Sequence, residues 1–307
     1  MPTKYENELG LLDRTYAEAL ELQIERLEEF VDRCYGLPLI AIGSGGSLTA
    51  AYMAATLHQA AGGFAKAMTP LEYLGSAKHI GQANILLLSA GGKNKDILST
   101  FRYSNLSEPS QLMTLCARKG SPLAEMAHEF RYTRLLDFNL ACGKDGFLAT
   151  NSLIAFIVLL LRAYVHKQSI NPFVFPTHLP SLKETASEIA PFIAQAISCD
   201  TWVFLHGVFG KPPAMDAESK LVEAALKNVQ VADYRNFAHG RHHWLAKRGQ
   251  DTSIISLITP SDEVIARKTL KLLPDTLAQG RIIATSPGPM GALELMVKVF
   301  QLVWCIL

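Results

Sequence analysis

Short runs of apolar residues alternate with amphipathic stretches along the chain, and the same alternation occurs in both halves. The apolar runs are continuous and lack a period-two pattern, so they predict parallel strands that are buried on both faces and covered by helices. The predicted strands span residues 37–42, 83–88, 112–116, 132–136, 201–205, 252–258 and 280–285. The clearest predicted helices span residues 48–61, 151–165, 214–229 and 289–307.

The first two junctions between a strand and its following loop recur at an offset of roughly 165 residues, which predicts a duplicated α/β domain. We expect a first domain with an N-terminal helical segment over residues 1–165, a linker over 166–181 and a second domain over 182–307. Each domain is expected to be a three-layer α/β/α unit around a parallel sheet. Ligands bind beyond the carboxyl ends of the strands in such sheets, so the loops there are the candidate sites.

The composition argues against several functional classes. With 49% hydrophobic and 19% charged residues the chain is expected to fold, and its formal net charge of +1 gives no electrostatic reason to expect nucleic acid or a membrane surface as a partner. The longest apolar stretch, 153–165, is interrupted by Arg162 and is shorter than the roughly 20 residues that a bilayer needs. The polar start has no targeting signal, and five scattered cysteines without a CxxC pair predict reduced thiols in the cytoplasm.

The first candidate loop follows the strand 37–42 and precedes a helix. Glycines let the backbone approach an anion, and free amides at a helix N-terminus attract negative charge. A phosphate or carboxylate cradle, a plain strand-to-helix turn and a dinucleotide site all stay open here, although Leu48 replaces the third glycine of GxGxxG. The absence of a GK[ST] sequence excludes a P-loop. The candidate binding residues are Ser44, Gly45, Gly46 and Ser47.

A second loop occupies the same position after the strand 83–88. It contains Ser89, Gly91 and Asn94, and Asp96 is placed to cap the helix that follows. A capped turn without a ligand accounts for these residues, and so does a second ligand-binding loop. Two small-residue loops at neighbouring strand ends would form one pocket, which favours the ligand interpretation for both.

The third group of candidates lies in the second half. The predicted helix 214–229 places Lys220, Glu223 and Lys227 on one face, which is either a solvated stripe of ion pairs or part of a site. Downstream, His239 and two more histidines fall within five residues, but the HExxH spacing and a carboxylate ligand pattern are absent, which disfavours a metal. A histidine held near a carboxylate suits proton transfer near neutral pH.

Taken in order, these residues resemble the SIS (sugar isomerase) family. More closely, they resemble its double-SIS members, the isomerase half of glucosamine-6-phosphate synthase and the fructosamine deglycases, and the similarity covers nearly the whole chain. Glu223 and His239 are 239 − 223 = 16 residues apart, which matches the family's spacing between its enolising glutamate and its ring-opening histidine. Lys220 falls on an active-site lysine of the family.

The resemblance implies two tandem flavodoxin-like SIS domains and ketose–aldose chemistry through an enediol or enediolamine, with no cofactor or metal. Glu223 would move a proton between C1 and C2 of a sugar phosphate, and Lys220 would steady the developing oxyanion. His239 would come from the neighbouring subunit of a homodimer and help to open the sugar ring. The resemblance does not explain Arg241 and the two histidines after it, whose positive charge would meet a second acidic group on the substrate.

The sequence departs from the family at positions that carry hydroxyl groups. The family's phosphate loop reads Ser-x-Ser-Gly-x-Thr, and here Gly91 and Asn94 replace its second serine and its threonine. Gly46 stands where a threonine is usual, and Ala149 replaces the serine before Thr150, which is retained as a binding residue. The lost hydroxyls predict weaker phosphate binding, a different anion or an unphosphorylated sugar, although Lys93 and Lys95 add charge nearby.

Three functional classes remain open on the sequence alone. The leading one is a sugar-phosphate or amino-sugar-phosphate isomerase or deglycase. The alternative is a module that senses a sugar phosphate or a nucleotide without catalysis, and the third is a structural dimerisation unit. The sequence includes neither the glutaminase domain nor the C-terminal lysine of the synthase, whose tail would begin just after Leu307, so ammonia-dependent amination is not expected.

Overall fold

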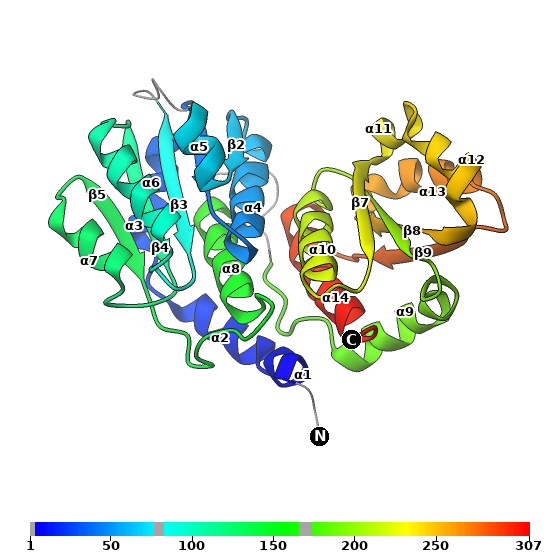
Figure 1. Cartoon of the computed structure of the whole chain (residues 1–307). Helices are drawn as coiled ribbons and strands as arrows, with labels where there is room; N and C mark the ends of the chain where they lie inside the picture. Colours follow the sequence, from blue (N-terminus) through cyan, green and yellow to red (C-terminus); the bar gives the residue numbers. More distant parts are fainter. Residues whose placement is uncertain (1–3, 77–82, 166–173) are drawn as a thin grey trace. The chain divides into compact units, whose positions relative to one another are not determined.

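The structure of the chain is a computed structural model that describes residues 4–76, 83–165 and 174–307. It divides into two compact units, Met1–Val174 and Phe175–Leu307, and each contains its own sheet (Figure 1). In the part of the chain that the structure describes, no helix is both long and apolar enough to cross a bilayer.

In the described residues of the first unit, three helices are followed by alternating strands and helices. They are α1 Lys4–Leu9, α2 Leu12–Glu21, α3 Glu25–Cys34, β1 Leu39–Ile42, α4 Gly46–Ala60, β2 Ala65–Met68, α5 Pro70–Ser76, β3 Asn84–Ser89, α6 Lys95–Leu106, β4 Gln111–Cys116, α7 Pro122–Glu129, β5 Thr133–Asp137 and α8 Asn151–Val165. The five strands are all parallel and lie in the order β2-β1-β3-β4-β5, which is the flavodoxin-like order. The strand order reverses between β1 and β3, which makes that pair the topological switch point.

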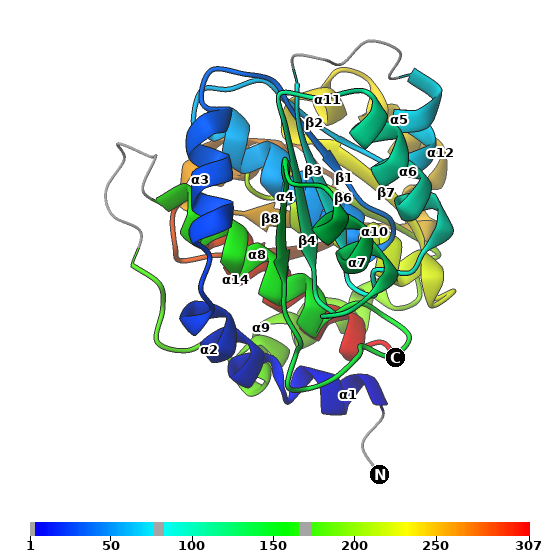
Figure 2. The ribbon, with the colours of Figure 1, turned by 90° about the vertical axis from the view of Figure 1, so that its left-hand side faces the viewer.

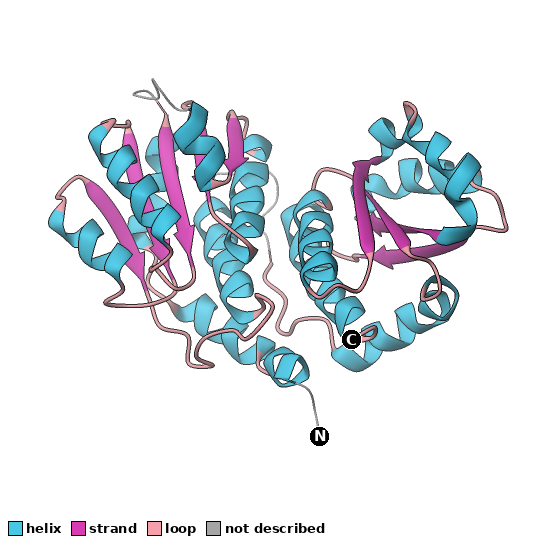
Figure 3. Ribbon diagram, in the orientation of Figure 1, coloured by secondary structure: helices cyan, strands magenta, loops and turns pink. Residues whose placement is uncertain are grey.

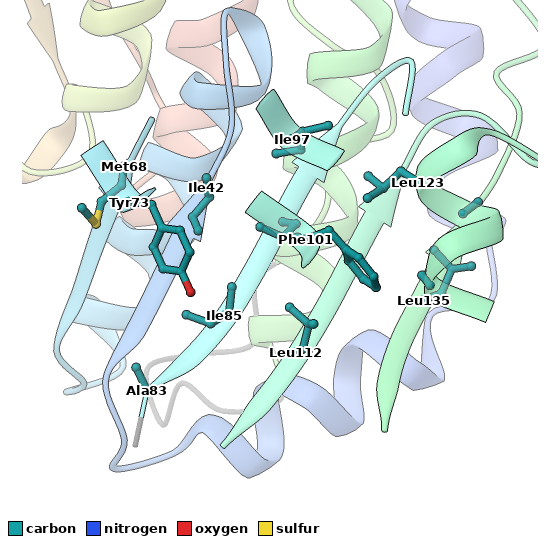
Figure 4. Packing of buried hydrophobic residues seen from close by; sticks show 13 residues of the cluster. Ile42, Met68, Tyr73, Ala83, Ile85, Ile97, Phe101, Leu112, Leu123 and Leu135 are labelled. Atoms are coloured by element: carbon teal, nitrogen blue, oxygen red, sulfur yellow. The ribbon is translucent and has the colours of Figure 1, made fainter. Parts of the chain in front are cut away.

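The sheet of the first unit is the middle of three layers (Figure 2). Helices α5, α6 and α7 cover one face, where side chains from β1, β3, β4 and β5 pack with Tyr73, Ile97 and Phe101 (Figure 4). Helices α3, α4 and α8 lie on the other face. α8 is buried over nearly its whole length, because α2, α3 and α4 pack around it, and this explains its continuous apolar sequence.

The second unit repeats the design with four strands (Figure 3). Its strands are parallel and lie in the order β7-β6-β8-β9, with α11 and α13 on one face and α9, α10 and α14 on the other. The longer elements are α9 Leu182–Ala196, β6 Thr201–His206, α10 Lys211–Glu223, β7 Asn228–Asp233, β8 Thr252–Ile258, α13 Glu263–Lys271, β9 Ala278–Ile283 and α14 Gly288–Trp304. The short ones are α11 Tyr234–Ala238, η1 Arg241–Trp244, α12 Leu245–Arg248, η2 Gly249–Asp251 and η3 Pro260–Asp262.

The structure confirms the α/β class and the buried parallel sheets. It adds two edge strands that the sequence analysis missed, β2 and β7, whose residues are only partly buried and include polar side chains. The exact domain boundaries stay predictions, and residues 166–173 of the predicted linker lie outside the described residues.

The predicted helix 214–229 was wrong in both of its ends. α10 begins at Lys211, just before two prolines that fit the first turn of a helix, and it ends at Glu223. Ala225 has a φ of 53°, and the amides of Ala225 and Leu226 donate to the carbonyls of Val222 and Leu221. This is a Schellman ending with alanine in place of the usual glycine, so the sequence carried no visible stop signal.

Candidate functional site

The two Gly/Ser loops of the first unit leave the switch point of its sheet. The loop 43–47 follows β1 and the loop 89–94 follows β3, and these two strands are hydrogen-bonded neighbours. The carboxyl ends of both strands therefore lie at the same edge of the sheet, which is where α/β proteins of this kind bind ligands. The structure thus brings together the two loops that the sequence analysis singled out.

The first loop is a tight strand-to-helix turn that only glycine fits at two positions. A Cβ at Gly43 would lie 2.3 Å from the carbonyl oxygen of Ser47, and Gly45 has a φ of +55°. The amide of Ser47 donates to the carbonyl of Ser44 at 3.1 Å, and the Ser44 side chain is exposed. α4 begins at Gly46, so the Ser44 and Ser47 hydroxyls lie at the positive end of a fifteen-residue helix.

The first loop also touches the segment before α8. A Cβ added at Gly46 would lie only 2.2 Å from the Cβ of Ala149. Two of the departures from the SIS pattern therefore occur at a single point of contact. A Cβ at position 46 would therefore displace Ala149.

The second loop uses most of its polar groups inside the turn. The amide of Gly92 donates to the hydroxyl oxygen of buried Ser89 at 3.1 Å, and the Asn94 side chain accepts from the amide of Asp96 at 2.7 Å as the N-cap of α6. Gly92 has a φ of +61°, and a Cβ there would collide with Ser121. The turn is well defined, and Gly91 is partly exposed in it beside exposed Lys93.

Thr150 lies in a buried cluster with two carboxylates. Its hydroxyl is 3.1 Å from Oδ1 of Asp145 and 3.3 Å from Oε2 of Glu8, and the threonine is fully buried. Asp145 also accepts from the amides of Thr150, Asn151 and Ser152, so it caps α8. Burial raises the pKa of the Glu8 carboxyl above its usual range, although the amide of Gly146 donates to it. A binding role for Thr150 stays a prediction.

Lys220 lies in the interior of the second unit. Its side chain is 3% exposed, its Nζ is 2.7 Å from Oδ1 of the equally buried Asp216, and it lies 4.4 Å from the ring centroid of Phe300 in α14. Of the two interpretations of Lys220, Glu223 and Lys227, the solvated stripe of ion pairs is wrong, because Lys220 is buried. Lys227 follows the end of α10, and its Nζ donates to the carbonyls of Ile197 and Cys199.

Glu223 is the last residue of α10 and is exposed. Its Oε1 accepts a hydrogen bond of 2.7 Å from the hydroxyl of Ser219, one turn earlier. Burial and the nearby carboxylate of Glu223 raise the pKa of Glu218 on the same helix. Glu223 therefore offers a solvent-accessible carboxylate whose orientation is set by the helix end.

His239 and Arg241 lie at the opposite edge of the same sheet. Glu223 precedes β7, and exposed His239 follows α11, which begins directly after β7. The six residues of β7 rise about 3.3 Å each, or roughly 20 Å in total, so Glu223 and His239 of one chain are far beyond hydrogen-bond reach. Arg241 is exposed and its Nη1 is 3.5 Å from the carbonyl of Val231.

The sequence analysis did not single out His206 at the end of β6. Its Nδ1 is 2.8 Å from the carbonyl of Gly207, and burial lowers the pKa of its imidazole. Asp262 packs against Gly207, where a Cβ would meet its carboxylate at 1.8 Å, and it caps the turn after β8 together with Thr259. The signal available in the sequence was the position of His206 directly after a buried strand.

Metal ligands do not gather in the described residues. Among residues 4–76, 83–165 and 174–307, no three His, Cys, Asp or Glu side chains are close enough together to hold an ion. The two Gly/Ser loops of the first unit carry amides and hydroxyls, which suit anion binding. Glu223 of the second unit carries an exposed carboxylate, which suits proton transfer.

Several solved structures of phosphosugar proteins are similar to this chain. The C-terminal domain of glucosamine-fructose-6-phosphate aminotransferase from Francisella tularensis has a TM-score of 0.74 and 13% identity, over 100% of this chain and 96% of that one. Tagatose-6-phosphate ketose/aldose isomerase from Escherichia coli has a TM-score of 0.72 and 14% identity, over 98% and 93%. The fold is that of the phosphosugar isomerases.

Glucosamine-6-phosphate deaminase from Thermotoga maritima shares the same fold, with a TM-score of 0.71 and 15% identity over 99% of this chain and 93% of that one. No protein-family model matches the sequence, and no curated protein matches it. The likeness therefore concerns the fold, and the chemistry has to be argued from the residues.

Proposed function

We propose that the chain is an isomerase or deglycase of sugar phosphates or amino-sugar phosphates that works as a cytoplasmic homodimer of tandem SIS domains. The observation that carries this proposal is the position of the two Gly/Ser loops on either side of the switch point in the first unit. The similar solved proteins are named for tagatose 6-phosphate, glucosamine 6-phosphate and glucosamine-fructose-6-phosphate, which supports substrates of this class.

The phosphate of the substrate would bind at the first turn of α4 and in the loop after β3. Ser44, Ser47 and the glycine amides of the first loop supply neutral donors at a positive helix end. In the second loop, Lys93 and Lys95 are exposed and add the positive charge that the missing hydroxyls do not supply. The buried Ser89 fixes the turn that presents them.

Glu223 would act as the base of the reaction. Its carboxylate takes the proton from C2 of an open-chain aldose while O1 takes a proton from solvent, which gives the C1–C2 enediol. The carboxylic acid then returns its proton to C1 while the O2 hydroxyl loses its proton to solvent, which gives the ketose. An exposed carboxylate held by Ser219 is suited to this transfer. His239 of the partner subunit would assist ring opening, since Glu223 and His239 of one chain lie at opposite edges of the sheet.

Lys220 takes a different role from the one that the family resemblance implied. Because its ammonium is buried against Asp216 and Phe300, it holds α10 onto α14 and thereby fixes the helix end that carries Glu223. We therefore assign Lys220 as a positioning residue for Glu223 rather than as a group that touches the sugar.

The test is turnover of fructose 6-phosphate, tagatose 6-phosphate, glucosamine 6-phosphate and a fructosamine 6-phosphate, followed by product analysis. With an active substrate, Glu223→Gln is expected to lower kcat by about 10²- to 10⁴-fold, the usual contribution of a general base. Glu263→Gln, at an exposed position on α13, is the matched control and should leave kcat unchanged. Full activity of Glu223→Gln would contradict the enolisation mechanism.

The alternative is a sensor that binds a sugar phosphate without converting it. The observation that favours it is the use of Ser89, Asn94 and Thr150 in hydrogen bonds within the protein. A sensor would show a ligand-dependent rise in Tm without product, and Ser47→Leu would abolish that rise. Ser198→Leu, an exposed serine in the second unit, is the control. An equal rise in both variants would contradict binding at the first loop.

A further inference from the structure

The first unit contains a large groove at the amino end of its sheet, opposite to the Gly/Ser loops. The groove has a volume of about 780 Å³ and is formed by α3, the turn between α7 and β5, and the first residues of β4 and β5. Its charged lining residues are Arg26, Arg33, Arg131, Arg134 and Glu29, and His128 also lies in the lining. The volume falls within the range of pockets that hold small-molecule ligands.

Arg134 is held in place by a chain of amides that crosses three strands. Its Nη1 donates to Oε1 of Gln111 at 2.9 Å, and Nε2 of Gln111 donates to Oδ1 of Asn84 at 3.0 Å. Asn84, the first residue of β3, is fully buried and donates to the carbonyl of Pro38. Such a network fixes the guanidinium before any ligand arrives, which reduces the entropy lost on binding.

The charges of the groove are unbalanced. Four guanidinium groups face a single carboxylate among the described lining residues, that of Glu29, and its Oε2 is 4.0 Å from Nε of Arg134. Arg26 also donates to the carbonyl of Leu135 at 3.3 Å, while Arg33 and Arg131 are exposed. Guanidinium groups that surround one concave site repel one another, and an anion with several oxygens relieves this repulsion through paired hydrogen bonds.

An aromatic surface lies beside these arginines. Tyr132 is 50% exposed in the lining, and its ring packs at 6.3 Å and a tilt of 59° against Phe130. Its hydroxyl donates to the carbonyl of Asn105 at 2.9 Å, which fixes the orientation of the ring. A fixed and half-exposed ring offers a face on which a flat heterocycle can stack.

We propose that this groove binds a nucleoside diphosphate or a closely related diphosphate ester. The diphosphate lies between Arg134, Arg33 and Arg131, and the base or sugar ring packs on Tyr132. A diphosphate suits the groove better than a single phosphate because several arginines from two separate elements, α3 and β5 with its preceding turn, have to be neutralised. The site lies a full strand length from the loops 43–47 and 89–94, so it is a second site and independent of the proposed sugar site.

The test measures binding of ADP, UDP, inorganic pyrophosphate and adenosine to the full chain by isothermal titration calorimetry. ADP or UDP should bind and adenosine should not, because the arginines need the phosphates. The double variant Arg33→Glu/Arg131→Glu should raise Kd by more than about tenfold, since it reverses two charges at exposed positions that the fold does not need. Arg267→Glu, an exposed arginine on α13, should leave Kd unchanged.

The same measurements distinguish a nucleotide from inorganic diphosphate as the ligand of the groove. Tighter binding of a nucleotide than of pyrophosphate supports stacking on Tyr132, and Tyr132→Ala should remove that difference. Equal affinity for both supports inorganic diphosphate as the ligand of the same arginines. Equal Kd values for the charge-reversal variant and the Arg267→Glu control would overturn the proposal. So would binding of adenosine as tightly as ADP.

Discussion

The ammonium of Lys220 lies 2.7 Å from the carboxylate of Asp216, and both side chains are at most 3% exposed. The two residues are one turn apart on α10, and the ring of Phe300 from α14 lies against the lysine. Removing a charge from water costs free energy, and an ion pair offsets part of this cost. The burial of each residue therefore depends on the charge of the other. The contact of the lysine with Phe300 contributes to the packing of α10 on α14.

Lys220→Met is expected to lower the free energy of unfolding by about 3–5 kcal/mol, because it leaves Asp216 as a buried charge without its ammonium. The measurement is urea denaturation followed by circular dichroism. The double variant Asp216→Leu/Lys220→Met should recover most of the loss, since it removes the charge as well. Lys271→Met, at the exposed end of α13, is the control, and an equal loss in this control would contradict the prediction.

Lys220 also shows where the sequence analysis was strong and where it failed. The buried runs of β3, β6 and β8 were visible as strands because their interior residues are apolar or small. The burial of the Lys220 side chain was not predictable from the sequence. A helix with many polar residues can still bury one lysine when an aspartate four residues earlier forms an ion pair with it. The end of α10 was hidden for a related reason, since alanine occupies the left-handed position at 225.

The candidate loops were predictable because they depend only on the strands being parallel. Once β1 and β3 are recognised as buried parallel strands, the loops after them fall at the same sheet edge. The groove of Arg26, Arg33, Arg131 and Arg134 was not predictable. Its residues come from α3 and from the β5 region, which are about 100 residues apart in the sequence. A net charge of +1 for the whole chain does not reveal a local cluster of positive charges.

The contact between Gly46 and Ala149 gives a test of the first loop. Gly46→Ala is expected to cost about 1–3 kcal/mol of unfolding free energy, because the new Cβ would lie 2.2 Å from that of Ala149. Adding Ala149→Gly should remove this cost, and the coupling is read from a double-mutant cycle of urea midpoints. Gly75→Ala, in a helix where nothing lies within 4 Å of the added Cβ, should cost nothing. Additive effects at positions 46 and 149 would argue against the contact.

Acid is expected to destabilise both units through their buried histidines. Burial lowers the pKa of His58 and of His206 below the ordinary value of 6.5. As the pH falls through 6.5, these histidines therefore take up protons in the unfolded chain before they do so in the folded chain. Their contribution to the free energy of unfolding is constant above this pH. It decreases below it until the lowered pKa of the folded state is reached.

The measurement is the free energy of unfolding at about pH 7.5 and about pH 5.5, compared between the wild type and His58→Gln. Glutamine can still bond the carbonyl of Leu37 and the hydroxyl of Tyr164, the two partners of His58, but it does not titrate. The variant should lose less stability on acidification than the wild type. His243→Gln, at an exposed position, is the control, and an identical acid loss in wild type and His58→Gln would contradict the assignment.

The separation of Glu223 and His239 by the length of β7 leads to a test of the proposed dimer. If each site takes Glu223 from one subunit and His239 from the other, Glu223→Gln and His239→Asn should each be inactive alone. Refolding the two variants together in equal amounts should restore about a quarter of the wild-type activity, because half of the dimers are mixed and each mixed dimer has one complete site. Refolding Glu223→Gln with the double variant Glu223→Gln/His239→Asn supplies no intact glutamate and should restore none. If the first mixture is inactive although mass spectrometry shows mixed dimers, Glu223 and His239 of different subunits do not form one shared site.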